Sequence, residues 1–193
     1  VDDGIRGKDF LAIEDGVLTV NAGDDGLKSD NEDDAELGYI AVEGGAITVI
    51  AGGDAITAQT DVLITGGMFA LTSGGGSGEQ VAADASAKGI KGLANIAIDS
   101  GTFTIDAADD AIHSNGNIVI NDGSFALRTG DDGIHADATV TINGGEIDIS
   151  QSWEGIESAV ITINDGNISV VSSDDGINVA GSMDGSGMMA GPG

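Results

Sequence analysis

The chain lacks cysteine and contains little proline and few aromatic residues. Without cysteine no disulfide can hold it together, so oxidising and reducing compartments are both open to it. A single Pro and no Gly-X-Y period exclude collagen, although Gly accounts for 33 of 193 residues. No apolar run approaches about 18 residues, so we expect neither a membrane span nor a signal peptide in the chain as given.

Positive charge is also scarce. Lys and Arg total 6 against 33 Asp and Glu, which gives a net charge of −27. Such a surface repels phosphate backbones and anionic lipids, so we expect neither nucleic acid binding nor membrane insertion. The same charge favours cations as partners.

A unit of 22 residues recurs along the chain. Its clearest copy begins with Asp131-Asp132-Gly133-Ile134-His135, and every copy has an aliphatic residue after the acidic pair. A fixed period in this range is typical of solenoids, in which each unit buries its apolar face against its neighbours. The aliphatic residues are Ile5, Leu27, Ile56, Ile90, Ile112, Ile134, Ile156 and Ile177.

Within each unit the apolar residues alternate, which is the period of a strand. Two such runs flank a turn that ends in Gly, where a residue without Cβ can adopt a positive φ. Phe69, Phe103 and Phe125 share one inward position and are expected to stack. The pattern predicts a single-domain, all-β parallel β-helix of about eight coils. The turn glycines are Gly16, Gly45, Gly67, Gly101, Gly123, Gly145 and Gly166.

The predicted domain covers residues 1–180, with insertions near 30–37 and 73–87. Residues 181–193 are rich in Gly and Met and predict a flexible tail. Because the chain begins inside a repeat, end-to-end stacking into a cell-surface fibre or adhesin is the structural alternative to a binding module. Filaments visible by microscopy would distinguish that alternative from a monomeric binder.

Stacked coils turn the acidic pairs into a ladder with a spacing of about 4.8 Å. Carboxylates at that distance repel each other, and Ca²⁺ relieves such repulsion with six to eight oxygen ligands. The absence of Cys and the presence of only two His count against zinc or copper. The predicted calcium ligands are Asp24, Asp25, Asp54, Asp109, Asp110, Asp131, Asp132, Glu154, Asp174 and Asp175.

Lys88 interrupts the ladder, which predicts two separate calcium clusters. One would contain Asp24, Asp25 and Asp54, and the other would contain Asp109, Asp110, Asp131, Asp132 and Glu154. The competing interpretation is that each Asp only caps a turn through the backbone. Capping needs one Asp per corner rather than two.

A second column follows the aliphatic position and holds five of the eight Lys, Arg and His residues. These cations either offset the acidic ladder or form, with calcium, a surface for an anionic polymer. The exposed ring of Trp153 would stack on a sugar or pack against its turn. The predicted carbohydrate-binding residues are Lys28, Lys91, His113, His135 and Trp153.

The repeated Asp-Asp-Gly-Ile-His followed by Val-Thr-Ile-Asn-Gly-Gly-Glu-Ile resembles a family of extracellular bacterial β-helix proteins with carbohydrate-binding domains, which are structurally similar to pectate lyases. The resemblance covers about residues 1–180. It implies a right-handed parallel β-helix, secretion or a cell-surface location, and several bound calcium ions. It also implies binding of acidic plant or cell-wall polysaccharide such as polygalacturonate, with cellulose as a further ligand. The positions that match the acidic motif best are Asp24, Asp25, Asp109, Asp110, Asp131 and Asp132, whereas Lys88, Trp153 and Glu154 depart from it.

Pectate-lyase chemistry needs an Arg or Lys base in a cleft beside a calcium-bound uronate. Only Arg6 and Arg128 are present, and Lys88 and Lys91 are the remaining substitutes. No long loops are expected to wall a cleft. The sequence therefore predicts a non-catalytic binding protein.

Overall fold

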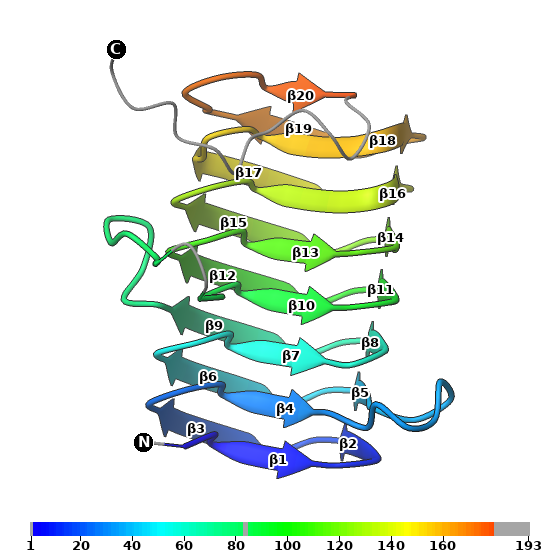
Figure 1. The fold of residues 1–193 in the computed structure, drawn as a ribbon. Helices are drawn as coiled ribbons and strands as arrows, with labels where there is room; N and C mark the ends of the chain where they lie inside the picture. The colour runs from blue at the N-terminus through cyan, green and yellow to red at the C-terminus, as the bar shows by residue number, and fades with distance from the viewer. Residues whose placement is uncertain (1, 83–84, 180–193) are drawn as a thin grey trace.

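The computed structural model describes residues 2–82 and 85–179 and shows a stack of parallel strands (Figure 1). The described residues are all-β, and the strands fall into three rows that wind around one core. The fold is a parallel β-solenoid, as the repeat predicts. Among the described residues, no helix has the length and hydropathy needed to cross a membrane. The predicted tail, 181–193, lies outside the described residues.

The first row starts directly after the acidic pairs, and the second row follows it along each coil. The first row comprises β1 (Ile5–Gly7), β4 (Leu27–Ser29), β7 (Ile56–Ala58), β10 (Ile90–Gly92), β13 (Ile112–Ser114) and β20 (Ile177–Asn178). The second row comprises β2 (Phe10–Ile13), β5 (Tyr39–Val42), β8 (Asp61–Ile64), β11 (Asn95–Ile98) and β14 (Asn117–Ile120). The long strands β16 (Ile134–Ile142) and β18 (Ile156–Ile163) run through both rows and join them into one 13-stranded sheet.

The third row is a separate seven-stranded sheet. It comprises β3 (Val17–Ala22), β6 (Ala46–Ala51), β9 (Met68–Ser73), β12 (Thr102–Ala107), β15 (Ser124–Thr129), β17 (Glu146–Gln151) and β19 (Asn167–Val170). Neighbouring strands pair so that residues one repeat apart lie opposite each other, for example Phe103 with Phe125. The insertion at 30–37 lies between β4 and β5, and the one at 73–87 begins at Ser73, the last residue of β9, and precedes β10.

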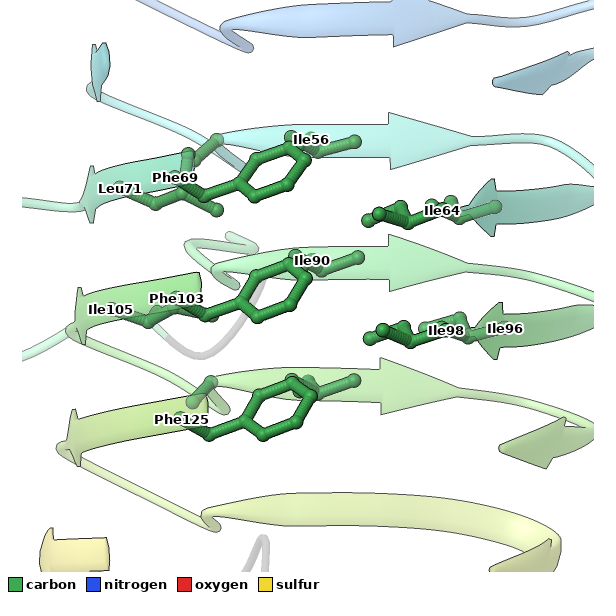
Figure 2. Close-up of a cluster of buried hydrophobic side chains, with 14 of the residues drawn as sticks. Ile56, Ile64, Phe69, Leu71, Ile90, Ile96, Ile98, Phe103, Ile105 and Phe125 are labelled. Carbon is green, nitrogen blue, oxygen red and sulfur yellow. The ribbon is translucent and has the colours of Figure 1, made fainter. Parts of the chain in front are cut away.

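The alternating aliphatic residues point inward and form one continuous core (Figure 2). Phe69, Phe103 and Phe125 stack in it with ring centroids 4.7 and 4.6 Å apart, which confirms the predicted column. All seven predicted turn glycines have φ between 98° and 139°, a region that L side chains rarely adopt. The local pattern therefore determines both the core and the turns.

A ladder of side-chain amides that the sequence reasoning missed lies in the turn after the second row. Asn121 donates to Asp99, Asn143 donates to Asn121, and Asn164 donates to Asn143, each at 2.7 Å. The signal was present, because these four residues occupy one position of the repeat. Such a ladder links successive coils on an exposed turn.

Candidate functional site

The acidic pairs lie at the corner that connects a third-row strand to the next first-row strand. The second residue of the pair carries a structural role, because its Oδ1 accepts a hydrogen bond from a backbone N–H of the next coil. The donors are Asp54 N to Asp25 at 2.9 Å, Lys88 N to Asp54 at 2.8 Å, Asp132 N to Asp110 at 3.1 Å and Glu154 N to Asp132 at 3.1 Å. These Asp residues thus do bind the backbone, as the competing interpretation predicts. The hydrogen bonds join successive coils, however, rather than closing the turn of the Asp itself.

The basic column has the register that the repeat predicts. Arg6 pairs with Lys28, Lys91 with His113, and His113 with His135 on neighbouring first-row strands. The side chains of the Lys and His members are largely buried along their length, with 13–25% exposed. These Lys and His side chains therefore lie against the corner, whereas the side chain of Arg6 is 59% exposed.

The Lys and His side chains of this column each face the second oxygen of a ladder Asp, whereas Arg6 pairs with Asp30 of the insertion. Lys28 Nζ lies 2.7 Å from Asp25 Oδ2, and Lys91 Nζ lies 3.5 Å from Asp54 Oδ2. His113 and His135 take the equivalent places beside the next two ladder carboxylates, at 2.8 and 3.5 Å. The two oxygens of a ladder carboxylate thus have different tasks, one toward the backbone and one toward a base.

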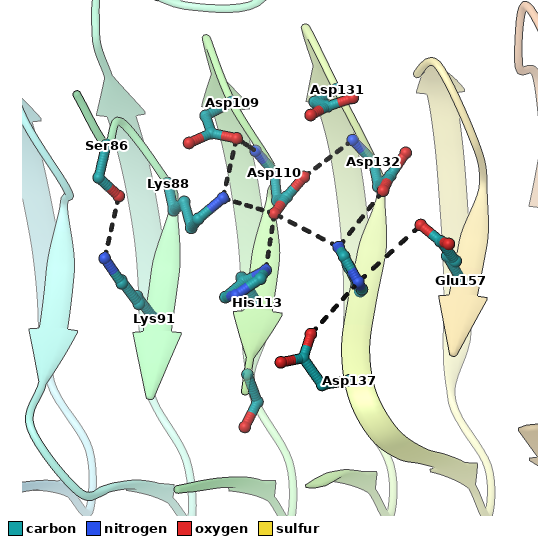
Figure 3. Close-up of polar contacts among 12 residues, drawn as sticks. Ser86, Lys88, Lys91, Asp109, Asp110, His113, Asp131, Asp132, Asp137 and Glu157 are labelled. Carbon is teal, nitrogen blue, oxygen red and sulfur yellow. Dashed lines mark hydrogen bonds and ion pairs between the residues drawn. The ribbon is translucent and has the colours of Figure 1, made fainter. Parts of the chain in front are cut away.

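Lys88 replaces an acid in the ladder and lies between two carboxylates (Figure 3). Its Nζ is 2.8 Å from Asp109 Oδ1 and 2.6 Å from Asp110 Oδ2. Burial opposes charge on both Lys88 and Asp110, but their mutual attraction outweighs it, which raises the pKa of Lys88 and lowers the pKa of Asp110. The predicted break in the acidic ladder is therefore filled by a buried ammonium group.

Among the residues that the structure describes, two groups of three carboxylates have oxygens within 4.8 Å of one another. One is Asp3, Asp24 and Asp25, and the other, here called the acidic trio, is Asp109, Asp110 and Asp131. Burial, followed by the charges of Asp110 and Asp109, raises the pKa of Asp131 to about 6. A carboxylate whose charge is disfavoured in this way would gain from a nearby cation.

These groups differ in membership from the clusters that the sequence predicts. Asp54 lies outside the group of Asp24 and Asp25, and its Oδ1 accepts bonds from Ser86 Oγ at 2.7 Å and Lys88 N at 2.8 Å. Metal binding by Asp54 stays a prediction. Asp3, from the preceding coil, takes that place. The insertion thus supplies Ser86 as a hydrogen-bond partner of Asp54.

The remaining predicted ligands lie nearer the C-terminal coils. Glu154 is buried and accepts hydrogen bonds from Asn178 Nδ2 at 2.9 and 3.1 Å. Asp174 and Asp175 are exposed. Within the described ranges, none of the three belongs to a group of potential metal ligands that meet within 4.8 Å. Metal binding by them stays a prediction.

Trp153 lies one coil beyond Asp131 on the same edge. Its backbone N–H donates to Asp131 O at 2.7 Å, and 46% of the residue is exposed. A tryptophan in this position offers an apolar ring to solvent beside the acidic trio.

Two histidines and their acidic neighbours form a further group, which the sequence reasoning treated as part of the basic column. The rings of His113 and His135 have centroids 4.9 Å apart and are nearly perpendicular. His135 Nδ1 lies 3.5 Å from Asp132 Oδ2 and 3.9 Å from Asp110 Oδ2. Its Nε2 lies 3.7 Å from Asp137 Oδ1 and 3.9 Å from Glu157 Oε2.

The protonation of this group follows from its burial. Burial is the main cause that lowers the pKa of His135, which favours the neutral imidazole. Burial also raises the pKa of Asp132, with further contributions from Asp110, Asp131 and a hydrogen bond to Glu157. In the sequence, Glu157 is the one acid at a position of the basic column. Its burial and its hydrogen bond to Asp132 are evident only in the structure.

Comparison with known proteins assigns the chain to a family. A search of curated proteins found no match, and neither did a search of solved structures. The sequence profile of the family described as carbohydrate-binding domain-containing protein matches residues 1–133 and 130–176, which together cover most of the chain. The protein therefore belongs to this family of carbohydrate-binding domain-containing proteins.

Proposed function

We propose that the protein is a non-catalytic module, secreted or at the cell surface, that binds acidic polysaccharide through calcium. Membership of a carbohydrate-binding family supports a carbohydrate ligand. The observation that carries the proposal is the acidic trio of Asp109, Asp110 and Asp131 beside the exposed ring of Trp153. Ca²⁺ takes six to eight oxygens, so three carboxylates leave positions for uronate oxygens and water.

Calcium is essential to this proposal because the basic column cannot supply a positive face by itself. Lys28 lies against Asp25 and Lys91 against Asp54, and Lys88 of the ladder lies against Asp109 and Asp110. With a net charge of −27, the protein would otherwise repel a polyuronate. A right-handed coil and a polygalacturonate-like ligand follow from the family resemblance and belong to the same proposal.

Binding to immobilised polysaccharides tests the proposal. The protein should bind polygalacturonate in the presence of calcium and lose that binding in chelator. In this proposal the bound Ca²⁺ bridges the carboxylates of the protein and those of the polymer. Trp153→Ala should weaken binding by about 1 kcal/mol or more if the ring stacks on sugar. Cellulose and a neutral glucan serve as comparison ligands.

The matched control is Phe10→Ala, which removes an exposed aromatic ring from the second row, away from the acidic trio. It should bind as the parent protein does. Equal binding to neutral glucan, or binding that survives chelation, would contradict a calcium-bridged site.

Asp131→Asn tests the calcium ligands through stability. In chelator the variant should melt at the same temperature as the parent or higher, because it removes a carboxylate whose charge is disfavoured by burial and by Asp110. Added calcium should raise the melting temperature of the parent and raise that of the variant less.

Asp122→Asn is the comparison variant, because Asp122 is exposed and its carboxylate only caps Gly123 N at 2.8 Å. It should keep the full calcium response. A parent protein whose melting temperature is the same in calcium and chelator would rule out a stabilising calcium site.

A further inference from the structure

Lys88 is the one basic residue in the column formed by the second residue of each acidic pair. Its neighbours in that column are Asp54 on the coil before and Asp110 on the coil after. Because the coils stack in register, the lysine side chain lies among carboxylates, and only 13% of it is exposed. A positive charge is thus buried in the corner at the one position where the column lacks an acid.

The ammonium group of Lys88 lies where a metal ion would bridge two carboxylates of the acidic trio (Figure 3). Its Nζ is 2.8 Å from Asp109 Oδ1 and 2.6 Å from Asp110 Oδ2. An ion that binds Asp110 would need the same Oδ2, because Oδ1 already accepts the backbone N–H of Asp132. The ammonium group and an ion at this place therefore compete for the same oxygen.

The charge of Lys88 also acts on the third member of the acidic trio. Burial, Asp110 and Asp109 raise the pKa of Asp131 to about 6, and the charge of Lys88 opposes that rise. A fixed ammonium group thus already offsets part of the repulsion among the three carboxylates. The gain that a bound ion could bring is smaller by that amount.

The other group of three carboxylates is arranged differently. Lys28 Nζ lies 2.7 Å from Asp25 Oδ2 but 3.5 Å from Asp3 Oδ1. That oxygen of Asp3 is buried and accepts no hydrogen bond. This group therefore retains an oxygen for an ion, whereas the two carboxylates nearest Lys88 are both engaged by it.

We propose that Lys88 is a built-in competitor of calcium at the acidic trio and determines how tightly this site binds the ion. The inference rests on the proposed function, because it takes the acidic trio as a calcium site. Calcium must either displace the ammonium group from Asp109 and Asp110 or bind beside its positive charge, and both lower the affinity. The site then fills only where calcium is abundant.

Calorimetric titration of the protein with Ca²⁺ tests the role of Lys88. Lys88→Met should bind calcium at least about 10-fold more tightly than the parent, because it removes a like charge a few ångströms from the ion. The gain should disappear in Lys88→Met/Asp131→Asn, which would assign it to the acidic trio. Tb³⁺ luminescence excited through Trp153, the only Trp of the chain, gives a second readout of this corner.

Lys8→Met is the matched control, because it removes the same charge from a side chain that is 64% exposed and pairs with Asp33 in the insertion at 30–37. It should bind calcium as the parent does. Circular dichroism verifies folding. Lys88→Gln, which keeps a hydrogen-bond donor, carries the test if Lys88→Met does not fold.

The outcomes separate the role of Lys88 from the proposed function. Calcium binding by the parent together with equal or weaker binding by Lys88→Met would overturn the competition and leave the calcium site standing. A gain that persists in Lys88→Met/Asp131→Asn would overturn it as well, because the affected site would then lie elsewhere. If neither the parent nor Lys88→Met binds calcium, the proposed function fails, and the role of Lys88 fails with it.

Discussion

Replacing Phe103 with alanine is expected to lower the free energy of unfolding by about 3–5 kcal/mol. Phe103 is the middle ring of the core stack, with Phe69 on one side and Phe125 on the other, and it is 1% exposed. Its removal opens a cavity between rigid coils that cannot collapse independently. Denaturant unfolding followed by circular dichroism measures the change.

Phe10→Ala provides the comparison for this prediction. Phe10 also stacks on an aromatic ring, that of Tyr39 at 5.5 Å, but it is 51% exposed. We expect that variant to lose well under half as much stability, because little apolar area returns to water. Equal losses for the two variants would show that ring stacking, rather than burial, dominates.

The second large effect is expected for Asp110→Ala. Asp110 accepts a backbone hydrogen bond from Asp132 and pairs with the buried Lys88 and with His113. Removing it leaves the ammonium group of Lys88 short of a partner, and breaking a buried ion pair costs about 3–5 kcal/mol. The melting temperature and the free energy of unfolding should both fall.

A double-mutant cycle with Lys88→Met separates the ion pair from the backbone cap. Lys88→Met/Asp110→Ala should be less destabilised than the sum of the single variants, because the orphaned charge is gone. Strict additivity would contradict a coupled pair. Asp99→Asn, which changes a more exposed carboxylate on the amide ladder, should have a much smaller effect.

Much of the fold could be predicted from the repeat. The register of the strands, the turn at Gly101 and the stacking of Phe103 on Phe125 follow from one period, because equivalent residues of successive coils must lie opposite each other. The amide ladder from Asp99 to Asn164 was equally accessible but was not recognised. The extent of the domain and the functional role of the site residues stay predictions.

The candidate site was predictable only in part. Its residues lie at the predicted corner, yet Asp3 rather than Asp54 accompanies Asp24 and Asp25. In the sequence, Lys88 interrupts the column of acidic residues. Nothing in the pattern shows that its Nζ reaches the carboxylates of the next coil. Such contacts depend on side-chain direction, which a period does not encode.

The sequence by itself determined a parallel solenoid with an aliphatic core, a column of acids and a column of bases, because each follows from residues repeated in register. Only the tertiary structure decided how each carboxylate is used. One oxygen of Asp110 caps the next coil and the other holds Lys88, whereas Asp132 and Glu157 are buried around His135. The physical reason is that hydrogen bonds and charge pairs are determined over a few ångströms, by burial and by insertions such as the one that carries Ser86.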